Sequence, residues 1–136
     1  MLPPNDMEYL QERAPGHSLA IDGGMTCIVI PAFALGAGFD LPNADLMLRL
    51  APGYPDVPPD MWWFSPAVRR TDGAEIPATQ AVEHHFGRPW QRWSRHLAVG
   101  QWRSGVTPVV EVVDAPTAVR PRALIGDGPP NIRPAA

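Results

Sequence analysis

The amino-acid sequence predicts an α+β domain with an N-terminal helix, a four-stranded antiparallel meander, an irregular segment and a C-terminal helix. Three observations predict this class. Residues 5–14 carry apolar side chains at helical spacing, residues 18–50 hold short apolar stretches separated by turns, and the aromatic run 61–64 follows a proline-rich turn. A helix that covers one face of an antiparallel sheet gives a two-layer domain.

The first helix is expected at residues 5–14. Asn5 can cap its start, and Leu10 and Ala14 recur at helical spacing. The Pro-Gly pair at 15–16 ends it, because proline cannot continue a helix and glycine is common just after one.

Four strands are expected to pair in sequence order. They are predicted at residues 18–22, 25–30, 45–50 and 60–64, with the second continuing through 33–35 as a kinked edge. The pair Gly23-Gly24 suits a hairpin turn, since both positions tolerate positive φ. Residues 36–43 are predicted to form a loop.

Residues 53–59 are predicted to form a stiff, extended turn. Pro55, Pro58 and Pro59 each fix φ and remove a backbone donor, so this stretch is neither helix nor ladder strand. In the strand that follows, Trp63 or Phe64 is expected to be buried in the sheet.

The pattern between residues 65 and 102 is irregular. A short helix is predicted at 79–86, and the segment 87–89 should break it. Trp90, Trp93 and Leu97 fall at i, i+3 and i+7, which predicts a second short helical piece.

The C-terminal helix is expected around residues 106–113, where four valines fit helical spacing. Valine is a mediocre helix former, so this run also resembles a strand. We expect one domain over residues 1–118 and a mobile Pro-, Gly- and Arg-rich tail over 119–136.

Composition and charge exclude several functional classes. A net charge of −3 and a pI near 5.7 argue against nucleic-acid binding, which needs a basic surface. The sequence shows no apolar run of membrane-spanning length and no secretory signal pattern. The single cysteine fits a reducing compartment, so we expect a cytoplasmic protein with no cofactor and no membrane partner.

All eleven basic residues are arginine. One explanation is compositional, because a chain rich in Ala, Pro, Gly and Arg is typical of a GC-rich genome. The other is functional: a protein that handles activated C-termini avoids acylation of its own side-chain amines. The sequence leaves both explanations open.

Two stretches carry a family resemblance. The string LRLAPGYPDVPPDMWWFSP at 48–66 resembles the ubiquitin-conjugating-enzyme (UBC) superfamily, which carries a YPxxPP signature between its third and fourth strands. The string FGRPWQRWSRHLAVGQW at 86–102 resembles a bacterial branch, prokaryotic family E. The resemblance covers about residues 5–113. It implies a UBC-like fold, a role in ubiquitin-like protein conjugation, and two partners: a ubiquitin-like protein and its activating enzyme.

The resemblance also shows what this chain lacks. An ordinary conjugating enzyme carries a His-Pro-Asn motif and then a nucleophilic cysteine after the proline-rich turn. Here Phe64-Ser65-Pro66 stands near that place, and no cysteine follows Cys27. Cys27 lies in an apolar strand and is predicted to be an inert core residue. The usual thioester mechanism is therefore not expected.

Four residues are candidates for other chemistry: His84, His85, Ser94 and His96. Histidine carries protons near neutral pH, and Ser94 could meet His84 or His85 across a loop. The alternative is structural, with each ring packed and hydrogen-bonded. No metal site is expected, because adjacent histidines rarely chelate one ion.

Six residues are candidates for partner binding: Arg88, Trp90, Arg92, Trp93, Arg95 and Trp102. The tryptophans can instead form a buried cluster, which the size of the indole ring favours. Exposed, together with the arginines, they would resemble a protein-binding hot spot.

Three functions remain open at this point. The domain binds a ubiquitin-like protein or its activating enzyme without forming a thioester, or it is an enzyme that uses a His or Ser in residues 84–96. The third alternative is a structural subunit that shares only the fold.

Overall fold

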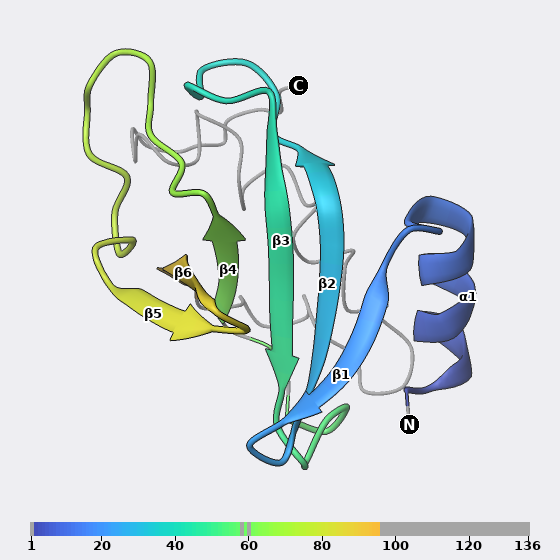
Figure 1. Cartoon of the computed structure of the whole chain (residues 1–136). Helices are drawn as coiled ribbons and strands as arrows, with labels where there is room; N and C mark the ends of the chain where they lie inside the picture. Colours follow the sequence, from blue (N-terminus) through green and yellow to red (C-terminus); the bar gives the residue numbers. More distant parts are fainter. Residues whose placement is uncertain (1, 58, 60, 96–136) are drawn as a thin grey trace.

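The computed structural model describes residues 2–57, 59 and 61–95, which form one helix and a curved, six-stranded antiparallel sheet (Figure 1). The elements are α1 (Pro4–Arg13), β1 (Ser18–Asp22), β2 (Met25–Ala34), β3 (Asn43–Leu50), β4 (Met61–Ser65), β5 (Val82–His85) and β6 (Arg88–Ser94). The α+β class is confirmed. The expected helix at 106–113 and the tail at 119–136 lie outside the described residues.

Strands β1 to β4 pair in sequence order, as the alternating pattern predicts. The full order is β1-β2-β3-β4-β6-β5, so β6 adds to β4 and β5 forms the outer edge. Strand β2 lies between β1 and β3 only as far as Val29, because among the described residues its later part pairs with β3 alone, so the predicted kinked edge is confirmed. The register shift between Ile30 and Phe33 places Pro31 at a bulge, where a missing backbone donor is tolerated.

The two short helices predicted at 79–86 and around 90–97 are wrong for the residues that the structure describes. Residues 82–94 form a hairpin, with Phe86 (φ 54°) and Gly87 (φ 78°) in the turn. The i, i+3 spacing of Trp90 and Trp93 suggested one helical face. In a strand, residues three apart point to opposite faces, and each ring is buried on its own side of the sheet.

Helix α1 starts one residue before the predicted boundary. Pro4 occupies its first turn, where the missing N–H costs nothing, and Pro3 precedes it without a side-chain cap. The predicted cap Asn5 therefore lies inside the first turn. The helix ends at Arg13, where the Ala14 N–H bonds the Leu10 carbonyl at 2.8 Å.

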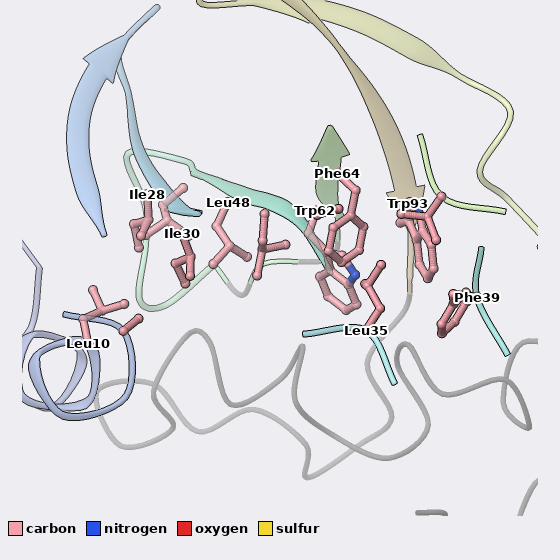
Figure 2. Close-up of a cluster of buried hydrophobic side chains, with 14 of the residues drawn as sticks. Leu10, Ile28, Ile30, Leu35, Phe39, Leu48, Trp62, Phe64 and Trp93 are labelled. Atoms are coloured by element: carbon pink, nitrogen blue, oxygen red, sulfur yellow. The ribbon is translucent and has the colours of Figure 1, made fainter. Parts of the chain in front are cut away.

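The main core lies on one face of the sheet, which we call the core face. Strand alternation directs Ile28, Leu48 and Phe64 to this face, and Leu10 of α1 joins the cluster at the end near Ile28 and Ile30 (Figure 2). Trp62 and Trp93, a cross-strand pair, extend the same cluster. The predicted burial of Trp63 or Phe64 is confirmed, since both side chains are buried.

The proline-rich turn is anchored to α1. The Tyr54 hydroxyl donates to the Asp6 carboxylate, and Asp6 is buried. Burial raises the pKa of Tyr54, and the hydrogen bond to Asp6 raises it further. Gly53 permits a close approach, because a Cβ there would lie 2.7 Å from Val57 Cγ2. The signature tyrosine thus ties the turn to the helix.

No helix in the described part of the chain is long and apolar enough to cross a bilayer.

Candidate functional site

The face opposite the core face, which we call the second face, carries a cluster of polar side chains. Strand register directs Glu83 and His85 of β5 and Arg92 of β6 to this face, beside Trp63 of β4. Beneath them Met47, Trp63 and Trp90 form a small buried apolar cluster. The polar side chains therefore lie over an apolar cluster that shields them from water on one side.

Glu83 is the centre of this cluster. Its Oε1 accepts hydrogen bonds from Trp63 Nε1 at 3.0 Å and His85 Nε2 at 2.9 Å. Its Oε2 accepts one from Arg92 Nη1 at 2.8 Å. We call these four residues the Glu83 cluster. Three donors from three strands converge on one carboxylate, so the cluster fixes β4, β6 and β5 relative to one another.

The environment keeps Glu83 ionised. Burial acts to raise the pKa of its carboxyl, but the hydrogen bonds from His85, Trp63 and Arg92 and the charge of Arg92 outweigh burial and lower it. A carboxylate that orients an imidazole is one component of general-base chemistry. Here the same carboxylate also accepts hydrogen bonds from the Trp63 indole and the Arg92 guanidinium. This arrangement is equally suited to holding the β5–β6 hairpin against β4.

Arg88 and Asp45 extend the second face. Arg88 Nη2 donates to Asp45 Oδ2 at 2.9 Å, and its guanidinium stacks over the Trp90 ring with its carbon 4.3 Å from the centroid. Trp90 Nε1 donates to the His85 carbonyl at 3.0 Å. The Arg88 side chain remains 40% exposed. Among the described residues, it is the most solvent-accessible ion-paired arginine on this face.

The candidate catalytic residues are not brought together. His84 is exposed and points to the other face from His85, because neighbours in a strand alternate. His85 lies opposite Arg88, and Ser94 is six residues further along β6, about 20 Å away at the rise of a strand. The structure thus provides no Ser94–His84 or Ser94–His85 pair. His96 lies outside the described residues.

Most of the candidate partner-binding residues have structural contacts. Trp90 and Trp93 are fully buried, so their rings are not surface anchors, and the buried-cluster interpretation fits both. Arg95 stacks over Trp93 and donates to the Pro77 carbonyl at 3.1 Å.

Burial lowers the pKa of Arg95 to about 10. Arg88 and Arg92 keep partly exposed cations. Trp102 lies outside the described residues.

Cys27 is a fully buried thiol on the second face of β2. Burial raises its pKa, against the opposing effect of the Arg49 charge. Arg49 lies across the ladder and donates to Cys27 Sγ at 3.5 Å and to Asp22 Oδ2 at 3.0 Å. A thiol without solvent access and with a raised pKa is a poor nucleophile. The sequence-based interpretation of Cys27 as an inert core residue agrees with this environment.

Sequence reasoning missed the contributions of Trp63 and Asp45 to this site, and it placed Glu83 near the histidines without giving it a role. The available signal was the i, i+2 spacing of Glu83 and His85, which puts both on one face of a strand. Within the described residues, no group of three or more His, Cys, Asp or Glu is arranged to hold a metal ion.

Comparison with known proteins gave one finding. Residues 2–115 match the model of the family described as Prokaryotic E2 family E. No curated protein and no solved structure matches significantly.

Proposed function

Because this chain belongs to prokaryotic E2 family E, we propose that it is a non-covalent binding component of a ubiquitin-like protein conjugation pathway. In this role it binds a ubiquitin-like protein, or the enzyme that activates one, and forms no thioester. The family match supports a UBC-like protein in a conjugation pathway.

The observation that carries this proposal is the position of the only thiol. Cys27 is buried in β2, with its pKa raised, and sits beside the Asp22–Arg49 ion pair. Thioester formation requires an accessible thiolate. The sequence holds no second cysteine.

Arg88 and Arg92 on the β5–β6 hairpin are the proposed contacts for a carboxylate-bearing partner surface. Charge-assisted hydrogen bonds to carboxylates are the strong class of polar contact. Both guanidiniums hold an ion pair, Arg92 with Glu83 and Arg88 with Asp45, but the Arg88 side chain is the more exposed and stacks on the Trp90 ring. We therefore expect Arg88 to contribute more to binding.

The finer architecture is part of the same proposal. A UBC-like arrangement would place a helix at 106–113 after this hairpin, within a domain of residues 1–118 followed by a tail at 119–136. A cytoplasmic location fits the single, reduced cysteine.

The test is a calorimetric titration of the full chain with the ubiquitin-like protein and, separately, with the activating enzyme. Cys27→Ala should bind as the wild type does, and Arg88→Ala should weaken binding about tenfold, the loss of one charge-assisted contact. Arg13→Ala is the matched control, because Arg13 also stacks over an aromatic ring, that of Tyr9. Absence of binding to both partners would refute the proposal and favour a structural subunit.

The Glu83–His85 hydrogen bond favours a second candidate, an enzyme without a cysteine nucleophile. In this candidate His85, oriented by Glu83, takes the proton of a target amine as the amine attacks the activated C-terminal carbonyl of the ubiquitin-like protein and the activating group leaves. His85→Asn should then abolish transfer to the target while binding survives. Under the binding proposal there is no transfer to abolish, and the substitution changes stability alone.

A further inference from the structure

Strand β1 forms one edge of the sheet and pairs on its inner side with β2 (Figure 1). The connecting turn has positive φ at Gly23 (60°) and Gly24 (80°), as in a two-residue type I′ hairpin. The residues that close such a turn, here Asp22 and Met25, share both backbone hydrogen bonds. The alternation along an antiparallel ladder then fixes the direction of every backbone group of β1.

Backbone N–H and C=O groups of successive residues in β1 point in opposite directions. Those of Ser18, Ala20 and Asp22 point toward β2, and those of Leu19 and Ile21 point away from the sheet. Two N–H donors and two carbonyl acceptors therefore face outward from Leu19 and Ile21. Among the described residues, Leu19 and Ile21 make no backbone hydrogen bond outside the β1–β2 ladder.

The side chains of the same two residues are unusually exposed. Leu19 is 44% and Ile21 73% accessible, although both belong to the core face, where their ladder partners are Ile28 and Thr26. Helix α1, which packs on this face through Leu10, leaves them uncovered.

Natural sheets protect their edges with Lys, Pro, bulges or inward-pointing charges. Strand β1 has no Lys or Pro, and its pairing with β2 is free of register shifts.

We propose that β1 pairs antiparallel with β1 of a second copy of this chain, around a two-fold axis at Ala20. Leu19 then lies opposite Ile21 of the second copy, and the four outward backbone groups of each strand form four hydrogen bonds. The same two side chains form two apolar cross-strand pairs on the core face. The contact is isologous, as expected for a closed dimer.

The sequence of β1 is self-complementary in this register. Around Ala20 it reads polar, apolar, small, apolar, polar, so each apolar residue meets an apolar one. Asp22, the only charged residue of the strand, lies opposite the uncharged Ser18, whose hydroxyl can donate to it.

The two Asp22 carboxylates stay about 13 Å apart along the strands. A dimer centred on Asp22 would instead place them face to face, which is unfavourable.

The first test is the solution mass of the full chain by light scattering at about 100 μM, where a micromolar contact is populated. We expect twice the 14.8 kDa of one chain. Ile21→Lys should give the single-chain mass. Val82→Lys is the matched control, since Val82 is an exposed apolar residue (56%) on the opposite edge strand, β5, and this variant should remain dimeric. A monomeric wild type, or dissociation by Val82→Lys alone, would overturn the proposal.

The second test fixes the register and does not depend on a destabilising substitution. In a non-hydrogen-bonded antiparallel pair, opposite Cα atoms lie about 4.5 Å apart, within the range of a disulfide. In a Cys27→Ala background, Ala20→Cys should form a covalent dimer under mild oxidation. Ser18→Cys, about 13 Å from its counterpart in this register, should not. Equal cross-linking of both variants, or of neither, would contradict pairing through β1 in this register.

Discussion

Replacing Glu83 by alanine should destabilise the domain by about 2–3 kcal/mol. The substitution leaves the Trp63 indole N–H without its acceptor, and Trp63 is only 6% exposed. An unpaired buried donor costs about 1–3 kcal/mol. The bonds to His85 and Arg92 are more accessible, since the Glu83 and Arg92 side chains are 32% and 35% exposed, so together they contribute about 1 kcal/mol.

The assay is urea unfolding monitored by tryptophan fluorescence at pH 7. The expected loss lowers the midpoint by about 1–2 M, because urea m-values for small domains are about 1–3 kcal/mol per M. Glu83→Gln is the matched variant. It keeps an oxygen acceptor for Trp63 and removes the charge, so it should cost about 1 kcal/mol.

The pH dependence supplies an independent check. The pKa of Glu83 is lower in the folded chain than in the unfolded one, so its stabilisation is present above the unfolded value, about 4.3. That stabilisation is lost as the pH falls through the folded pKa. The difference in unfolding free energy between wild type and Glu83→Gln should therefore shrink below about pH 4. A Glu83→Ala variant within about 0.5 kcal/mol of wild type would refute the reasoning about this cluster.

Three further substitutions test the fold. Phe86→Asn should raise the unfolding free energy by about 0.5–1 kcal/mol in the same assay, because Phe86 has φ 54° in a turn that favours Asn-Gly, and an unchanged midpoint would count against that turn type. Tyr54→Phe should cost about 1–3 kcal/mol by removing the donor to buried Asp6. Because the pKa of Tyr54 is raised in the folded chain, this cost should be present in full below the ordinary pKa of tyrosine and should decrease as the pH rises above it. Trp63→Ala should cost about 3–5 kcal/mol by thermal melting, and an unaltered Tm would mean that the ring does not support the second face.

The meander could be predicted from the sequence because its signals are local. Alternating apolar residues, a Gly-Gly turn and a proline-rich turn define β1 to β4 through neighbours a few residues apart. The β5–β6 hairpin gave conflicting local signals. Trp90 and Trp93 fit a helical period, and only the pairing of β6 with β4 and β5 shows that this stretch is a strand, in which the two rings face opposite sides.

The candidate site was harder to predict for the same reason. Glu83 and Trp63 are 20 residues apart in sequence and meet only because β6 and β5 add to β4. Arg88 and Asp45, 43 residues apart, meet in the same way. The sequence identified the right segment through its histidines and arginines, but nonlocal strand pairing decides which of these side chains share a face. The β5–β6 pairing separates Ser94 from His85, whereas alternation along β5 itself puts Glu83 beside His85.

Intact-mass spectrometry tests the central claim most directly. The full chain is incubated with the activating enzyme, ATP and the ubiquitin-like protein, under conditions in which calorimetry detects binding. A non-covalent binding component keeps its mass of 14.8 kDa. An added mass of one ubiquitin-like protein on this chain would contradict the claim, and loss of that adduct in Cys27→Ala would identify the buried thiol as its nucleophile.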